Sequence, residues 1–190
     1  MSLAFNGHSA ASGVAGETDP GACARCAQKF TTCCVITQDI VEFCFPLSLQ
    51  EQQAIRAFTG NEEGMTVAAN TKAFTKSIQD LFPGEHVRVG ALFASWEFHR
   101  HLAVNEQGAC VFLSENGCAL PRDVRPAYCR IFPFWVRKGE LLHFAMPDCQ
   151  AQRESRTHAG LLDLFGMKET DVHALYRTIR QGWGLPPTRR

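Results

Sequence analysis

The sequence predicts an α+β fold. Helical patterns are mixed with short β-branched and aromatic stretches, without the regular strand and helix alternation that a parallel sheet needs. A chain of 190 residues, with 45% hydrophobic and 20% charged residues, has the size of one domain and enough apolar side chains for a core. We therefore expect small antiparallel strands and several helices around an all-cysteine metal-centre region, with an amphipathic helix at the C-terminus.

The two ends of the chain differ from its middle. Residues 1–21 are small, aperiodic and rich in glycine and serine, which is typical of a flexible tail. The cysteine-dense stretch 23–34 has no hydrophobic period, so a loop is expected there. Residues 185–190 are predicted to be a C-terminal tail, and residues 22–184 then form a single cysteine-rich domain.

The first regular elements follow the cysteine-dense stretch. Residues 35–45 are β-branched and aromatic, which favours a strand or two. Ser48 and Glu51 have the spacing of a capping box and predict a helix over 49–58, ended by Gly60.

A second helix is predicted after Asn70 or Thr71, either of which is a good cap, and it ends before Pro83-Gly84. The two helices form an insertion near 48–83. The apolar face of the second helix consists of Ala73, Phe74, Ile78, Leu81 and Phe82.

Strands are predicted in the middle of the chain. Residues 87–93 suggest a strand followed by a turn, and residues 96–104 a further strand. Within 110–120, Asn116-Gly117 is a strong signal for a two-residue hairpin turn.

The last third is more regular. Residues 123–131 are predicted to form a short helix, and residues 134–146 a hairpin that turns at Lys138-Gly139. A C-terminal helix follows, with Thr170 as its cap. Its apolar face consists of Val172, Leu175, Tyr176, Ile179 and Trp183.

Charge and hydropathy exclude several classes of partner. The 19 basic residues balance 19 acidic ones, so no net field gathers nucleic acid or anionic lipid. No uncharged apolar run approaches the roughly 18 residues that a spanning helix needs, and no signal peptide is recognisable. We expect a cytoplasmic protein that binds neither nucleic acid nor membrane, while a protein partner or substrate stays open.

The unusual feature is nine cysteines. In a reducing cytosol, clustered cysteines favour metal ligation or catalysis over a disulfide framework. Disulfides and inert core thiols remain the minor alternatives. Thioredoxin-type redox chemistry would need a helix that opens at Cys23 in a βαβ setting, which the flanking residues do not indicate.

The spacing of the cysteines bears on how many centres they form. Cys23 and Cys26 can chelate one centre from a single turn. Adjacent side chains in an extended segment point to opposite faces, so Cys33 and Cys34 suggest two centres, or one centre and one neighbour. Cys44 lies in a predicted apolar strand and is expected to be a buried thiol outside the ligand set.

The second half of the chain adds four more sulfurs, those of Cys110, Cys118, Cys129 and Cys149. The resulting eight divide naturally into two four-sulfur sites. If Asn116-Gly117 is a two-residue turn, Cys118 pairs with Glu115 and lies ~16 Å from Cys110, so these two serve different centres. A wider loop would let them share one.

These segments together resemble a known family. The ordered motifs are Cys23-x-x-Cys26, Cys33-Cys34, Cys110-Val-Phe-Leu, Gly117-Cys118-Ala-Leu, Arg125-Pro126-Ala-Tyr-Cys129-Arg130-Ile-Phe-Pro133-Phe134 and Asp148-Cys149. From about residue 23 to about 150 the chain is similar to the zinc- or iron-chelating CxxCxxCC domain family, the YkgJ type. Six residues separate Cys26 from Cys33, where the family usually has two or three, and a long insertion precedes Cys110.

The resemblance implies a metal cofactor. The same domain occurs in flagellin lysine N-methylases, so an iron-sulfur cluster is implied, of the 4Fe-4S type and one or two in number, and methyl transfer to protein lysine is permitted. Four thiolates suit zinc equally well. Arg125 and Arg130 flank Cys129 and are expected to soften the negative charge of the centre. The other basic residues near the cysteines are expected to be solvated: Arg25, Lys29 and Arg122.

His99 and His101 offer one more pair of potential ligands. They share a face of a predicted strand, although a polar strand face explains that spacing more often than metal ligation does.

Three functional hypotheses follow. The first is a metal-cluster module that serves structure, electron transfer or metal handling. The second is an enzyme, a cluster-dependent lysine methyltransferase that acts on a partner protein, and the third is a structural zinc domain for protein interaction. S-adenosylmethionine binding separates the second from the first, and metal identity separates the third.

Overall fold

The fold is α+β, as predicted. The computed structural model describes residues 21–29, 33–36, 44–146 and 148–187. Within these ranges the chain forms eight helices and three separate pairs of antiparallel strands. The predicted tail, residues 1–21, lies outside the described residues except for Gly21, which begins a helix, so the prediction is wrong for Gly21.

The first helix, α1 (Gly21–Ala27), replaces the loop expected over residues 23–34. Ala22 and Ala27 are buried in it, and alanine is the strongest helix former. Cys23 and Cys26 therefore lie one helical turn apart. Residues 30–32 lie outside the described residues.

The strand predicted over residues 35–45 is described only at its two ends. Val35 makes a single antiparallel bridge with Ala109, and residues 37–43 are not described. Cys44 and Phe45 are buried but are not in a strand, so the prediction is wrong for these two residues.

The two helices predicted near 48–83 are confirmed. α2 (Leu49–Thr59) begins with the expected capping box, in which the carboxylate of Glu51 accepts the backbone N–H of Ser48 at 2.7 Å. α3 (Lys72–Leu81) begins after Thr71, whose hydroxyl accepts the N–H of Phe74 at 3.0 Å.

The strand predicted in residues 87–93 is instead the helix α4 (His86–Leu92). Val87 is 91% exposed and Val89 is fully buried, while Phe93 is also buried. The inward positions thus have a helical spacing, and packing against α3 overrides the strand preference of the valines.

One strand pair was only half predicted. β2 (Phe98–Leu102) lies within the predicted strand 96–104, and it pairs with β1 (Met65–Ala69), which the sequence did not reveal.

The hairpin in residues 110–120 is present, but its turn is displaced by one residue. β3 (Leu113–Ser114) pairs with β4 (Gly117–Cys118), so the turn residues are Glu115 and Asn116. Gly117 then has a φ of 99°, a conformation that glycine adopts readily. The partner of Cys118 is Leu113, and the prediction of Glu115 is wrong.

The hairpin of β5 (Phe134–Arg137) and β6 (Glu140–His143) is confirmed, with its turn at Lys138-Gly139. Both turn residues have positive φ, 53° and 85°, which matches the twist of the two strands.

Four helices complete the described chain: α5 (Ala127–Ile131), α6 (Gln150–Glu154), α7 (His158–Leu164) and α8 (Glu169–Gly182). The first is shorter than the helix predicted over 123–131, and α6 and α7 were not predicted. The predicted C-terminal helix is confirmed, but it begins before Thr170, and the carboxylate of Asp171 accepts the N–H of Lys168. Leu185 and Pro186, assigned to a tail from the sequence, pack against the end of α8.

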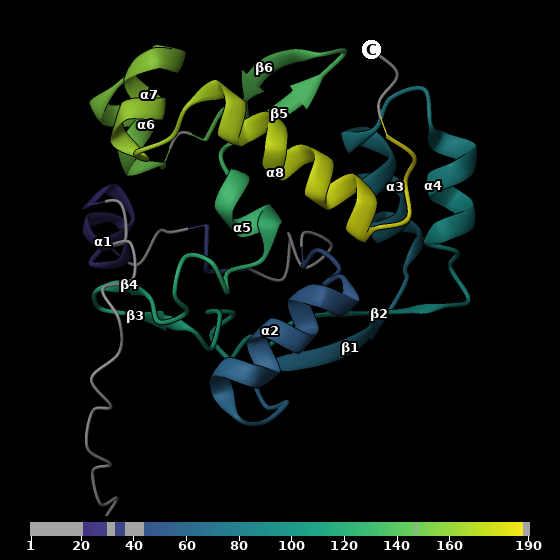
Figure 1. Cartoon of the computed structure of the whole chain (residues 1–190). Coiled ribbons are helices and arrows are strands. Elements are labelled where there is room, and N and C mark those ends of the chain that lie inside the picture. The colour runs from purple at the N-terminus through teal and green to yellow at the C-terminus, as the bar shows by residue number, and fades with distance from the viewer. Residues whose placement is uncertain (1–20, 30–32, 37–43, 147, 188–190) are drawn as a thin grey trace, which may run out of the picture.

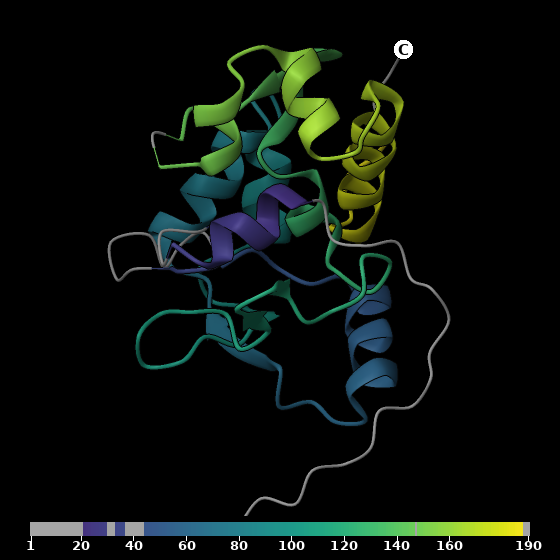
Figure 2. The ribbon, with the colours of Figure 1, turned by 90° about the vertical axis from the view of Figure 1, so that its left-hand side faces the viewer.

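The buried side chains form two clusters. The larger one joins α3, α4, α5, α8 and the β5–β6 hairpin, and the smaller one consists of Leu47, Ile55, Met65 and Leu120 beneath α2. Figures 1 and 2 show α1 between α6 and the β3–β4 hairpin, at the boundary of these two parts. Cys23 and Cys149 pack against the larger cluster and Cys118 packs against the smaller one.

Candidate metal centre

The eight cysteines predicted as ligands come from segments far apart in the sequence. Cys23 and Cys26 lie on α1, Cys118 lies on β4, and α1 contacts both β4 and α6. Cys129 lies on α5, and Cys149 is the residue before α6. Cys33, Cys34 and Cys110 lie in irregular segments.

Backbone hydrogen bonds place Cys110 close to its neighbours. Its N–H donates to the carbonyl of Cys34 at 2.8 Å, and its own carbonyl accepts the N–H of Leu113 at 2.8 Å. The second bond closes a turn, after which the hairpin pairs Leu113 with Cys118. The chain thus doubles back between Cys110 and Cys118, so these residues do not lie on the single extended strand for which a separation of ~16 Å was expected.

Four thiols form one neighbourhood: Cys34, Cys110, Cys118 and Cys129. Burial raises the pKa of Cys129 well above its usual value, and the other three thiols raise it further. Burial raises the pKa of Cys110 to about 12, and the thiols of Cys34 and Cys118 add to this shift, while a hydrogen bond from the backbone of Phe112 opposes it. The thiolate forms of this group therefore lack enough nearby positive charge or hydrogen-bond donors to stabilise them.

The other four thiols lie around α1. Burial raises the pKa of Cys26, and Cys149 and Cys34 act in the same direction, while a backbone hydrogen bond from Gln150 lowers it. A hydrogen bond with the Cys34 thiol, followed by burial, raises the pKa of Cys33, and the thiols of Cys23 and Cys129 also contribute. Cys34 is thus a neighbour of both groups of thiols.

Cys33 and Cys129 combine exposure with strong desolvation. Both are exposed by surface area, yet burial raises the pKa of each thiol. The two observations agree if each thiol lines a recess, surrounded by protein but open on one side.

Tyr128 and Glu51 border the thiols, and sequence reasoning assigned neither to the site. Burial, followed by the thiols of Cys129 and Cys33, raises the pKa of Tyr128, whose ring lies 4.0 Å from that of Phe45. The carboxylate of Glu51 accepts the N–H of Ala127 at 2.7 Å, and its charge raises the pKa of Cys129. No signal in the sequence distinguished Glu51 from an ordinary capping residue.

Of the two arginines predicted to support the centre, Arg125 has a described contact with the backbone of a candidate ligand. Arg125 donates to the carbonyl of Cys118 at 3.2 Å and to that of Leu120 at 2.8 Å, so it holds the backbone of a candidate ligand. Arg130 is half-buried on α5, next to Cys129.

The basic residues predicted to be solvated join neighbouring segments. Arg25 forms an ion pair with Glu154 at 2.6 Å, and Lys29 donates to Gln150 at 2.6 Å. Both bonds are exposed; Arg25 connects α1 with α6, and Lys29 connects the segment after α1 with α6. Arg122 donates to the carbonyl of Phe165 at 3.3 Å.

His99 and His101 share a face of β2, as predicted, and both are buried. The ring of His99 bonds the side-chain oxygen of Asn70 at 2.8 Å and the carbonyl of Cys44 at 3.1 Å, and the ring of His101 bonds the carbonyl of Leu102. The described contacts of this pair are therefore those of core histidines.

Cys44 is a buried thiol, as expected, and burial raises its pKa. It nevertheless lies near enough to Cys110 to raise the pKa of that thiol. Cys44, the cysteine outside the predicted ligand set, thus borders the candidate centre.

The cysteines are neighbours but do not form a closed ligand set. Among the described residues, no three histidine, cysteine, aspartate or glutamate side chains are arranged so that they could hold one metal ion. Thiolates are the ligands that zinc and iron-sulfur clusters use, so the chemistry of the donor set fits such a group. None of the described helices has the length and apolar character needed to cross a bilayer.

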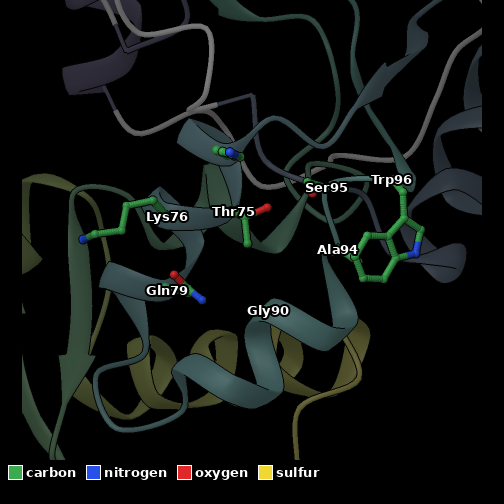
Figure 3. Close-up of a pocket in the computed structure, with 8 residues that line it drawn as sticks. Thr75, Lys76, Gln79, Gly90, Ala94, Ser95 and Trp96 are labelled. Carbon is green, nitrogen blue, oxygen red and sulfur yellow. The ribbon is translucent and has the colours of Figure 1, made fainter.

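A separate hollow of ≈ 200 Å³ lies between α3 and α4, and none of its described lining residues is a cysteine. Figure 3 shows Thr75 and Gln79 along α3, opposite Gly90 and Trp96.

The comparisons with known proteins return no match. No family model fits the chain, and no curated protein or solved structure is significantly similar to it. The proposed function therefore rests on the arrangement of the cysteines in this chain.

Proposed function

We propose that the chain binds metal through its eight neighbouring cysteines, as iron-sulfur clusters, and that the bound centres serve structure, electron transfer or metal handling. The observation that carries this proposal is the convergence of thiols from α1, the hairpin, α5 and the start of α6. Apolar packing alone gives no reason to collect so many ionisable groups in one place.

The eight proposed ligands can be divided into two groups of four, although Cys33 and Cys34 each neighbour thiols of both groups. One group holds Cys34, Cys110, Cys118 and Cys129, and the other holds Cys23, Cys26, Cys33 and Cys149. This division assigns the adjacent Cys33 and Cys34 to different centres, although their thiols form a hydrogen bond and do not point to opposite faces as the sequence suggested. Metal binding would draw each group of four together, because ligands in a thiolate site lie about 2.3 Å from the metal.

Amide donors support the same proposal. The backbone of Phe112 bonds the thiol of Cys110, and the backbone of Gln150 bonds that of Cys26. Such N–H donors reduce the negative charge that four thiolates leave on a centre. Arg125 and Arg130 would add positive charge nearby.

The experiment is anaerobic purification, followed by analysis of metal, acid-labile sulfide and visible absorption. Iron with an equal amount of sulfide supports the proposal, zinc without sulfide would support the structural zinc domain, and no bound metal would refute both. A titration with S-adenosylmethionine tests the methyltransferase alternative on the same sample.

Two cysteine variants provide a matched control. Cys129→Ala removes a proposed ligand and should lower the bound metal, whereas Cys44→Ala should keep it and cost only core packing. Equal metal loss from both variants would show that Cys44 belongs to the ligand set.

A further inference from the structure

A second hollow, of ≈ 410 Å³, lies where the segment after β6 meets α6 and the turn that follows it. Its described lining residues include no acidic side chain but two arginines, Arg153 and Arg156, and one histidine, His143. A concave surface of this size is large enough for part of a small molecule.

The two arginines differ in their partners. Arg153 donates to the carboxylate of Asp148 at 2.9 Å, so part of its charge is already compensated. Arg156 is exposed, and in the part of the chain that the structure describes it has no carboxylate partner. The hollow thus carries a net positive charge, on a guanidinium whose planar fork suits an oxyanion.

His143 adds an independent observation. Its Nδ1 atom is buried and has no hydrogen-bond partner among the described residues, which is uncommon for a buried polar atom. Its ring meets that of His158 edge to face, with the centroids 4.9 Å apart. His143 lines the hollow, whereas His158 is not among its lining residues.

The remaining polar side chains build the hollow and are not available to a ligand. Gln152 accepts the N–H of Met146 at 2.9 Å and donates to the carbonyl of Phe144 at 2.7 Å. These bonds fix the segment after β6 against α6. Ser155 accepts the N–H of Thr157 at 3.4 Å, so a ligand is left with the guanidinium groups of Arg153 and Arg156.

We propose that this hollow binds a small molecule through an oxyanion, the chemistry shared by carboxylates and phosphates. The site goes beyond metal binding and does not depend on it. α6 lies between this hollow and α1, which carries Cys23 and Cys26. Gln150 and Glu154 face α1, while Gln152 and Arg153 face the hollow, and Cys149 immediately precedes this helix.

The test is a titration of the purified full chain with inorganic phosphate and, separately, with acetate, at constant ionic strength against chloride. Backbone NMR signals of residues 150–156 report binding. Arg156→Gln should weaken the oxyanion affinity about tenfold or more, as expected for the loss of a charge-assisted bond. Arg177→Gln is the matched control, because Arg177 is an exposed arginine on α8, outside the hollow.

The outcomes distinguish a phosphate ligand from a carboxylate ligand, and some of them refute the proposal. A response to phosphate alone identifies a phosphate site, a response to acetate alone identifies a carboxylate site, and a response to both supports the shared chemistry. Equal affinities of Arg156→Gln and Arg177→Gln, or no response to either anion, would overturn it. Metal content measured on the same samples keeps this result separate from the proposed metal centres.

Discussion

The aromatic core and the cysteine region are stabilised by different kinds of contact. In the core, Trp135 and Trp183 are buried, and each indole N–H donates to a carbonyl, of Leu81 at 3.0 Å and of Pro46 at 2.9 Å. The core therefore buries apolar area and leaves these polar atoms satisfied. The cysteine region instead gathers thiols that raise one another's pKa. The difference implies that the core is stable by itself and that the cysteine region depends on what its sulfurs bind.

Metal removal should therefore reduce the stability of the protein more than the other changes proposed here, and the loss should be confined to the cysteine region. Structural thiolate sites contribute on the order of 10 kcal/mol, which is comparable to the whole stability of a domain. Treatment with a strong chelator should increase hydrogen exchange and proteolysis in α1 and the β3–β4 hairpin but leave α8 protected. Equal protection of α1 with and without metal would contradict this dependence.

A core substitution should behave in the opposite way. Phe134 is fully buried against the larger cluster, so Phe134→Ala should lower the free energy of unfolding by about 3 to 5 kcal/mol. Denaturation with and without chelator should give the same decrease. A loss seen only in metal-loaded protein would show that core and centre are not separable.

A smaller loss of stability is expected when the pH is lowered, because of His99. Burial, followed by the neighbouring His101, lowers the pKa of His99 to about 4. The neutral ring then stabilises the fold above pH 6.5, and this contribution, about 3 kcal/mol, is lost as the pH falls from 6.5 to about 4.

Urea denaturation across this pH range checks the loss. His99→Phe keeps a ring against Phe74, which lies 3.9 Å away, and should flatten the pH dependence. His86→Gln alters an exposed histidine and should leave the dependence unchanged, so equal slopes in both variants would refute the assignment to His99.

The smallest expected change in stability concerns an ion pair at the end of α8. Arg180 is 3% exposed, pairs with Glu85 at 2.6 Å and donates to the carbonyl of Pro186 at 2.7 Å. Arg180→Gln should cost about 1 to 3 kcal/mol, against less than 0.5 kcal/mol for the exposed Arg177→Gln.

The Arg180 pair also predicts a pH dependence. Its guanidinium lowers the pKa of Glu85, so the pair stabilises the fold above the ordinary carboxyl pKa and loses this effect as the pH falls below it. Thermal denaturation at pH 7 and pH 3 should show a smaller difference between wild type and Arg180→Gln at pH 3. An unchanged difference would exclude the ion pair as its source.

The sequence predicted elements whose signals are local. The Ser48 and Glu51 capping box, the Lys138-Gly139 turn and the period of α8 all act within a few residues, and each is found. α4 was missed because valine favours strands by itself, while its contact with α3 is set by the tertiary fold.

The candidate site was predictable as a list of residues but not as an arrangement. The sequence left open whether Cys110 and Cys118 lie apart on an extended strand or share a centre across a wider loop, and the turn that closes between Cys110 and Leu113 was not visible in the pattern. The approach of Cys149 to Cys26 spans more than a hundred residues, and no local preference encodes it.

The most direct test of the central claim is metal stoichiometry in Cys129→Ala, Cys149→Ala and the double variant, each purified anaerobically. Two four-thiolate centres predict that each single variant keeps about half of the wild-type metal and that the double variant keeps almost none. Complete loss in either single variant, or no loss in Cys149→Ala, would contradict the division of the eight cysteines into two centres.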